Sequence, residues 1–139
     1  MIIVDTNVLS EALKPAPSDA VLRWLAAQEP SAVYTTAITE AELLYGVEAL
    51  QPGKRRTRLR ETVERVLAEE FSARILPFDE HAARTFATIV AARDASGRPI
   101  SQFDAMIAAI SKSHRAVLAT RNAGDFQDCG ILVVNPWLE

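Results

Sequence analysis

The sequence predicts one α/β domain, with a central parallel β-sheet and helices on both faces. Short apolar segments without polar alternation recur along the chain, as expected for strands that are buried on both faces. Helix-favouring segments separate them, and parallel strands require crossover connections of this kind. The chain has 139 residues, 49% of them apolar, and no linker long enough to divide it. We therefore expect residues 1–139 to form a single domain.

Five segments are predicted as strands because they are short, largely apolar and rich in β-branched residues. They are Ile2–Val4, Ala32–Thr35, the brief extended piece Arg74–Pro77, Ala116–Ala119 and Ile131–Val134. Ligands of parallel α/β sheets bind where the strands end at their carboxyl edge. The residues that follow these segments are therefore the first candidates for function.

Five helices are predicted between and beside these strands. They run from Ser18 or Asp19 to about Gln28, from about Thr39 to Leu50, from Lys54 to about Glu70, from Asp79 toward Gly97, and from Ser101 to about His114. Capping side chains at the starts and proline or glycine at the ends set these limits. Thr39 with Glu42, and Ser101 with Asp104, match the capping-box pattern.

The composition excludes several classes of protein. The longest apolar runs are far shorter than the roughly 18 residues of a transmembrane helix. Met1 leads directly into an apolar segment without a preceding basic region, so no signal peptide is expected. Cys129 is the only cysteine, which excludes an internal disulfide and a multi-cysteine metal site. The expected location is the cytoplasm.

The charge is unevenly distributed. A formal net charge of −3, from 15 basic and 18 acidic residues, does not by itself indicate a nucleic-acid-binding protein. One basic run has no acid inside it and contains Lys54, Arg55, Arg56, Arg58 and Arg60. We interpret this run either as the solvated start of a helix or as a rim that follows a phosphate backbone, where arginine can bind phosphate bidentately.

Acidic side chains gather where predicted strands end and helices begin. Asp5 follows the first strand, Glu40 and Glu42 follow the second, and Asp104 opens the last helix. Taken singly, each fits a structural role: Asp5 can cap the next turn, although Asn7 can do so equally well. Together, converging carboxylates repel one another unless a cation lies among them, and oxygen ligands favour Mg²⁺ or Mn²⁺. Such a cluster can activate water for attack on a phosphodiester.

Helical periodicity does not decide between Glu40 and Glu42. We prefer Glu42 because its face of the helix carries Tyr45 and Gly46, and small residues there leave room for a site. A further acid, Asp125, follows the fourth predicted strand. It extends the acidic group to a third loop at the same edge of the sheet.

The segments that carry these residues are Ile2-Ile3-Val4-Asp5-Thr6-Asn7, Glu42-Leu43-Leu44-Tyr45-Gly46, Asp104-Ala105-Met106-Ile107-Ala108-Ala109 and Ala119-Thr120-Arg121-Asn122. Together with Ile75-Leu76-Pro77-Phe78-Asp79-Glu80 and the closing Asn135-Pro136-Trp137, they resemble the PIN-domain ribonucleases. More narrowly, they resemble the VapC and FitB-like toxins of type II toxin–antitoxin systems. The similarity covers essentially the whole chain, in order and at the expected intervals. It implies a PIN-domain fold over residues 1–139.

The resemblance also implies an activity and its partners. These are a Mg²⁺- or Mn²⁺-dependent endoribonuclease, a cognate antitoxin that inhibits it, and a homodimer that can form a heterotetramer or a larger assembly with the antitoxin. An RNA substrate and no membrane association are expected. The alternative is a catalytically weak PIN-like module that binds RNA or a protein partner.

Site roles transfer only to the positions that match the family's motifs. Asp5, Glu42 and Asp104 match the metal-binding acids, and Thr6 and Asn7 match groups that support the first of them. The candidates for the remaining roles are Asn122, which stands where FitB-like sequences have a fourth acid; Asp125, which can supply that charge; and Arg121, Lys54, Arg55 and Arg56 as contacts to RNA. Because these acids are expected to repel one another at an exposed edge, Asp5→Ala and Asp104→Asn are expected to abolish cleavage with little loss of folding.

Overall fold

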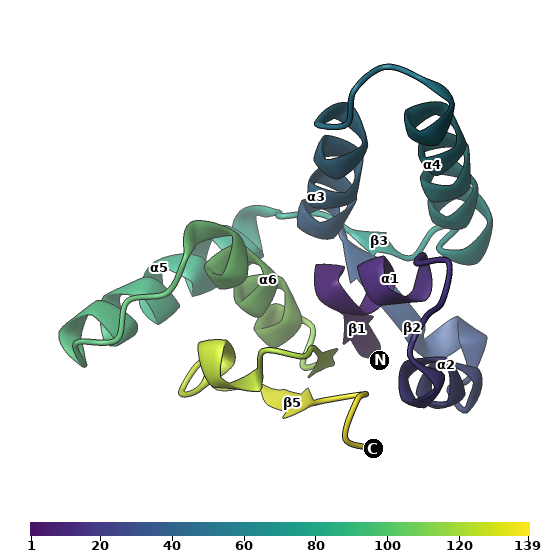
Figure 1. Cartoon of the computed structure of the whole chain (residues 1–139). Helices are drawn as coiled ribbons and strands as arrows, with labels where there is room; N and C mark the ends of the chain where they lie inside the picture. The colour runs from purple at the N-terminus through teal and green to yellow at the C-terminus, as the bar shows by residue number, and fades with distance from the viewer.

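The fold is a five-stranded parallel sheet with helices on both faces (Figure 1). The structure is a computed structural model that describes residues 1–139. The strands are β1 (Ile2–Val4), β2 (Val33–Thr36), β3 (Ile75–Leu76), β4 (Val117–Ala119) and β5 (Leu132–Val134), in the spatial order β3-β2-β1-β4-β5. Every neighbouring pair is parallel, and Ile2 of β1 lies opposite both Val33 and Val117. The predicted fold class is confirmed.

Six α-helices connect the strands. They are α1 (Thr6–Ala12), α2 (Asp19–Ala26), α3 (Ala37–Glu48), α4 (Lys54–Arg65), α5 (Glu80–Ala95) and α6 (Gln102–Ser113). A π-helical segment, Val66–Glu70, continues α4, and short 3-10 helices occupy Pro30–Ala32 and Ala123–Phe126. In Figure 1, α3 and α4 stand side by side above the sheet, and α5 and α6 lie together to its left. None of these helices combines the length and the apolar character needed to cross a membrane.

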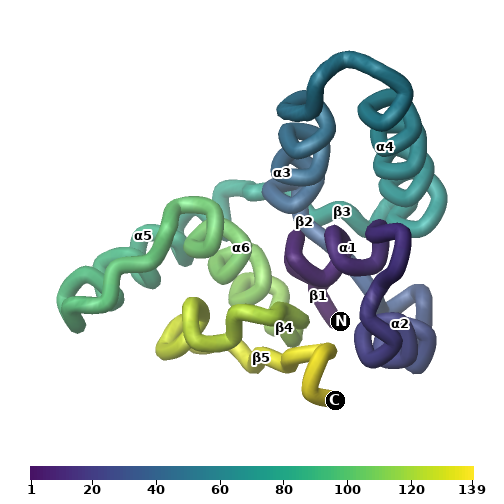
Figure 2. Tube along the Cα trace, viewed as in Figure 1, coloured from purple at the N-terminus to yellow at the C-terminus, as the bar shows by residue number.

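Consecutive residues of the central strands bury their side chains on opposite faces of the sheet. Ile3 of β1 and Leu118 of β4 belong to one core cluster, to which α5 and α6 contribute. Val4 and Ala119, the next residue of each strand, belong to a second cluster with side chains from α1, α2, α3 and α4. The chain path in Figure 2 shows these two groups of helices on different sides of the sheet. Burial on both faces explains why the strands show no polar alternation.

The predicted helix caps are partly confirmed. Ser18, Asp79 and Ser101 each accept a hydrogen bond from the main-chain N–H three residues later, as predicted for the starts of α2, α5 and α6. The predicted capping box of Thr39 with Glu42 is wrong. Thr36 is the cap instead: its hydroxyl accepts from the N–H of Thr39 at 3.1 Å, so α3 begins directly after β2.

Core packing on both faces of β4 predicts a large cost for truncating its central side chain. Leu118→Ala removes a fully buried side chain and is expected to lower the free energy of unfolding by about 2–5 kcal/mol. The matched control is Leu132→Ala on β5, where the leucine is 74% exposed, and we expect a change of about 0.5 kcal/mol or less. Urea unfolding followed by circular dichroism measures both; equal losses would contradict this description of the core.

Candidate active site

Asp5 and the residues after β4 lie at the carboxyl edge of the sheet, where the order of the strands reverses, whereas Lys54, Arg55 and Arg56 lie at the start of α4. From β1 the chain proceeds outward to β2 and β3, and then returns to the other side of β1 as β4 and β5. In open α/β sheets ligands bind at such a switch point. Asp5 directly follows β1 and Thr120 directly follows β4, so these two residues flank it.

The carboxylate of Asp5 accepts three hydrogen bonds. Oδ1 accepts from the N–H of Thr6 at 2.7 Å, which caps α1. Oδ2 accepts from the hydroxyl of Thr120 at 2.8 Å and from the side-chain amide of Asn7 at 3.1 Å. Asp5 is only 4% exposed. It is therefore a buried connection between β1, α1 and β4, and not the exposed edge acid that the sequence analysis expects.

Asn7 supports this arrangement but does not cap α1. Its Nδ2 donates to Asp5 and, at 3.2 Å, to the hydroxyl of Thr120, while its Oδ1 accepts from the main-chain N–H of Arg121 at 3.1 Å. Thr120 is fully buried and also accepts from the N–H of Asn122. Sequence reasoning assigned no role to Thr120; its place directly after a predicted strand, beside Asp5, is the signal that could have identified it.

Glu42 is tied to the same segment by a chain of hydroxyl groups. The hydroxyl of Thr6 donates to Glu42 Oε1 at 2.8 Å and lies 3.1 Å from the hydroxyl of Thr39. Thr39 is fully buried, and its hydroxyl lies 3.4 Å from that of Thr36. Glu40 makes none of these contacts. The structure thus places Glu42, the preferred of the two acids, beside the β1–α1 junction.

Asp104 approaches from the first turn of α6. Its N–H donates to the Ser101 hydroxyl at 3.2 Å, and its side chain is half-buried. Burial raises the pKa of the Asp104 carboxyl, the hydroxyl of Ser101 lowers it, and the negative charges of Asp5 and Asp125 raise it further. Asp104 therefore lies within electrostatic reach of both acids.

Burial and a neighbouring negative charge also act on the carboxyl group of Asp5. Burial raises the pKa of the Asp5 carboxyl, and the negative charge of Glu42 adds to the rise; the hydrogen bonds from Thr120, Thr6 and Asn7 oppose it without cancelling it. The net effect at both Asp5 and Asp104 is a carboxyl group whose ionised form is disfavoured. A bound cation would remove that penalty.

The chemistry of the donors suits Mg²⁺ or Mn²⁺, since every candidate ligand is a carboxylate oxygen. The cluster is nevertheless open: no three Asp, Glu, His or Cys side chains converge closely enough to enclose a metal ion by themselves. Mg²⁺ commonly binds through one or two carboxylates and keeps several water or substrate oxygens as its other ligands. An open cluster is compatible with this mode of coordination.

The fourth acid lies on a less buried segment. Asp125 belongs to the 3-10 helix Ala123–Phe126, and its side chain is exposed. Asn122 is also exposed, and its side chain makes no hydrogen bond within the protein. Of these two candidates, Asp125 is the one whose charge acts on Asp104.

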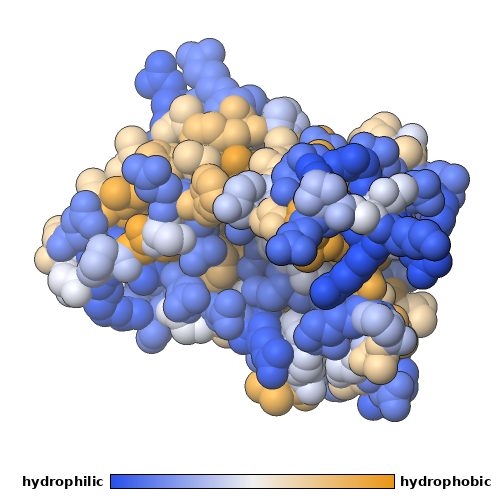
Figure 3. Space-filling view, turned by 45° about the horizontal axis from the view of Figure 1, so that its top comes forward, coloured by the Kyte–Doolittle hydropathy of each residue, from blue (hydrophilic) through white to orange (hydrophobic).

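The basic candidates divide into free and engaged side chains. Arg56, with Arg60, forms an ion pair with Glu48 at 2.5 Å, so its charge is already partnered. Lys54 and Arg55 form no ion pair and are exposed. The guanidinium of Arg121 stacks over the indole ring of Trp137, 5.0 Å from its centre. Figure 3 shows strongly hydrophilic side chains on the right of the view, the side on which α3 and α4 lie.

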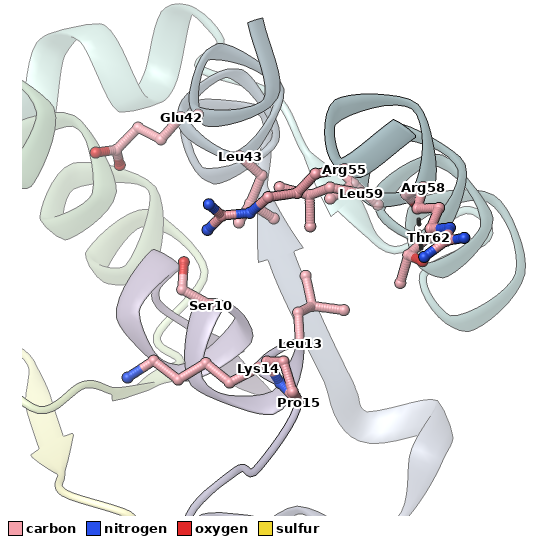
Figure 4. A pocket seen from close by; sticks show the side chains of 12 residues that line it. Ser10, Leu13, Lys14, Pro15, Glu42, Leu43, Arg55, Arg58, Leu59 and Thr62 are labelled. Carbon is pink, nitrogen blue, oxygen red and sulfur yellow. Dashed lines mark hydrogen bonds between the residues drawn. The ribbon is translucent and has the colours of Figure 1, made fainter. Parts of the chain in front are cut away.

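A cavity of about 440 Å³ opens beside Glu42, between α1, α3 and α4. Leu13, Leu43 and Leu59 form part of its wall, and Arg55 extends across it from α4 (Figure 4). A second cavity of about 300 Å³ lies between α1, α2 and the π-helical segment, with mostly apolar walls.

Comparison with known proteins finds a matching family model and relatives that are similar over nearly the whole chain. A family model described as PIN domain matches residues 2–131. VapC ribonuclease Y4jK of Sinorhizobium fredii (strain NBRC 101917 / NGR234) is 41% identical over 137 residues, which cover 99% of this chain and 98% of that protein. Toxin FitB of Neisseria gonorrhoeae (strain ATCC 700825 / FA 1090) is 42% identical over 99% of both.

The crystal structure of FitAcB from Neisseria gonorrhoeae matches this structure with a TM-score of 0.93 at 42% identity, over 99% of each chain. The similarity therefore extends over all the segments that carry the acidic cluster, and not over the sheet alone.

The raised pKa of Asp104 predicts how stability depends on pH in metal-free buffer. Between the ordinary aspartate pKa of 3.8 and the raised pKa of Asp104, the folded protein holds this proton more tightly than the unfolded chain, so stability falls as pH rises through that window. Asp104→Asn is therefore expected to have a higher urea midpoint than the original protein at pH 7, and the difference should shrink as the pH approaches 3.8.

Urea titrations from pH 4 to pH 8 in EDTA measure this difference. Glu64→Gln, at an exposed position of α4, is the control and should change stability by about 0.5 kcal/mol or less. In contrast to the sequence-based expectation, Asp5→Ala should destabilise the fold, because it removes the α1 cap and the acceptor of Thr120. A lower midpoint for Asp104→Asn at pH 7 would contradict the repulsion between these acids.

Proposed function

The chain belongs to the PIN domain family, and we propose that it is a metal-dependent endoribonuclease toxin of the VapC and FitB kind. The observation that carries this proposal is the placement of Asp5, Glu42 and Asp104, from three separate segments, along one edge of the sheet, where Glu42 acts electrostatically on Asp5 and Asp5 on Asp104. Burial and neighbouring carboxylates raise the pKa of Asp5 and of Asp104, and perturbed acids of this kind cluster at functional sites. Similarity to a VapC ribonuclease supports RNA as the substrate, and similarity to toxin FitB supports the role of a toxin.

In this proposal Asp5 and Asp104 hold a Mg²⁺ or Mn²⁺ ion, and Asp125 adds negative charge on the side of Asp104. A cation bound there lowers the pKa of the attacking water and stabilises the leaving oxygen of the phosphodiester. The hydrogen bonds of Thr120 and Asn7 fix the direction of the Asp5 carboxylate, and the capped start of α6 fixes the position of Asp104.

Glu42 orients the attacking water or binds the ion through water. The hydroxyl of Thr6 donates to Glu42 Oε1, which leaves its other oxygen free to accept a proton or a water. Because Thr6 is also the first residue of α1, the direction of Glu42 is coupled to the Asp5 cap. Asp5 and Glu42 are thus positioned by one continuous set of hydrogen bonds through Thr6.

Basic side chains at the rim guide RNA toward this acidic centre. Lys54 and Arg55 at the start of α4 are exposed and unpaired, and Arg121 lies directly after Thr120. Such cations offset the repulsion between a polyanion and an acidic site. Arg56 contributes less, because Glu48 already neutralises it.

The partner of the protein is a cognate antitoxin, as expected for a toxin of this kind. Its docking surface in this proposal includes the cavity between α1, α3 and α4, where apolar walls adjoin Glu42 and Arg55. An antitoxin arginine that reached Glu42 from this cavity would form a charge-assisted hydrogen bond with the acidic centre. We also propose that the protein forms a homodimer.

Cleavage of a mixed pool of cellular RNA tests the catalytic assignment. We expect discrete products with Mn²⁺ and none with EDTA. Asp104→Asn and Glu42→Gln should each lower the rate by at least about 100-fold, since even groups that only orient metal ligands change activity by about 10–100-fold. Glu40→Gln, on the same helix, is the matched control and should cleave at the original rate.

Each alternative result has a definite meaning. Full turnover in Asp104→Asn would remove that residue from the mechanism. A Glu40→Gln defect with active Glu42→Gln would reverse the choice between the two glutamates. A folded protein that neither cleaves RNA nor binds Mn²⁺ would favour the alternative of a module that binds RNA or a partner.

A larger side chain in the cavity beside Glu42 should prevent inhibition by the antitoxin without preventing RNA cleavage. Gly46 lines this cavity and has no heavy atom within 4 Å of an added Cβ, so a side chain can start there without a clash, and the leucine of Gly46→Leu is expected to extend into the cavity. We expect Gly46→Leu to cleave RNA normally but to resist the antitoxin encoded beside it, measured as residual cleavage at increasing antitoxin. Ala91→Leu, at an exposed position of α5, should remain fully inhibited. Equal inhibition of both variants would exclude the cavity as the docking surface.

A further inference from the structure

Arg93 of α5 is a buried arginine without an acidic partner. It is 6% exposed and takes part in none of the ion pairs of the protein. Burying a charged group is unfavourable unless other polar groups satisfy it. The groups that Arg93 binds in place of a carboxylate therefore indicate which part of the structure this side chain holds.

Most of these groups belong to the segment that carries Asp125. Nη1 of Arg93 donates to the main-chain oxygen of Asp125 at 2.9 Å and to that of Gln127 at 3.0 Å, and it lies 3.5 Å from the sulfur of Cys129. Nε donates to the main-chain oxygen of Arg98 at 2.6 Å, in the loop between α5 and α6. Arg93 thus joins the end of α5 to the segment after β4.

Few other contacts fix Asp125. Its N–H donates to the main-chain oxygen of Asn122 at 3.0 Å, and its exposed carboxylate makes no hydrogen bond or ion pair. Phe126, the next residue, is buried in the core. The carbonyl of Asp125 on one side and that of Gln127 on the other are both held by Arg93, so this guanidinium restricts the turn from which the Asp125 carboxylate projects.

We propose that Arg93 is a positioning residue for the metal centre, which holds Asp125 beside Asp104 by binding the carbonyl groups of Asp125 and Gln127. The inference rests on the proposed function, because the placement of Asp125 matters for activity only if the acidic cluster binds a cation. Arg93 itself touches neither substrate nor ion.

Binding of Mn²⁺ to the purified, RNA-free protein tests this role, with free Mn²⁺ measured by electron paramagnetic resonance. Arg93→Met and Asp125→Ala are each expected to weaken Mn²⁺ binding by about 10-fold, the lower end of the effect of groups that orient metal ligands. If Arg93 acts through Asp125, the double variant should bind no more weakly than either single variant. Arg93→Lys, which keeps an N–H donor near this segment but not the full guanidinium geometry, should lie in between.

Arg98→Ala is the matched control. Arg98 contacts the same segment, but through the side chains of Asp128 and Gln127 at its outer end. We expect Arg98→Ala to keep the original Mn²⁺ affinity. Hydrogen exchange of the amides of residues 122–129, which needs no metal, should accelerate in Arg93→Met. Should Arg93→Met fail to fold, Arg93→Gln provides the same comparisons.

Unchanged Mn²⁺ affinity in folded Arg93→Met would overturn the inference, and so would a double variant whose loss equals the product of the single losses. Failure of the original protein to bind Mn²⁺ would overturn the proposed function together with this inference. Binding by the original protein that is insensitive to Arg93 would overturn the inference alone.

Discussion

The constraint on which the site depends is that the buried carboxylate of Asp5 must be satisfied from three directions. It lies at the end of the central strand, where an unpaired charge would be costly. The N–H of Thr6, the hydroxyl of Thr120 and the amide of Asn7 meet this need. Because Thr120 directly follows β4 and Thr6 begins α1, these hydrogen bonds also set how the strands and the first helix meet. The acid that would bind a cation is thus the same group that orders the edge of the sheet.

Because Asp5 serves both the fold and the proposed cation site, the requirements of stability and of function conflict at this residue. Burial raises the pKa of Asp5 and of Asp104, and neighbouring carboxylates add to the rise, so the folded protein holds negative charge where it is disfavoured. Proteins retain such local conflicts at functional sites, where the remainder of the fold offsets the cost. Here the two core clusters, one on each face of the sheet, supply the stabilisation that the acidic edge lacks.

Helix starts could be predicted from the sequence where the capping residue and its hydrogen-bond donor lie within a few residues of each other. Three caps, at Ser18, Asp79 and Ser101, act over three residues and could be predicted from the sequence. The start of α3 could not, because two threonines compete for the cap, and Thr39 is buried inside the helix, where its hydroxyl faces Thr6. Helix α1 has only seven residues, so its apolar pattern was too brief to predict, although Asp5 was recognised as a possible cap of the turn that follows β1.

The sequence alone determined the fold class, the burial of the sheet on both faces and the identity of the acids at its edge, because these follow from apolar patterning and from the residues next to each strand end. Only the tertiary structure decided which of those residues meet. Thr120 and Asp5 are 115 positions apart, and Glu42 and Thr6 are 36 apart. It also decided that Arg56 is paired with Glu48 and that Arg93 binds the Asp125 segment. Such pairings depend on strand order and register, which bring together residues that no local pattern connects.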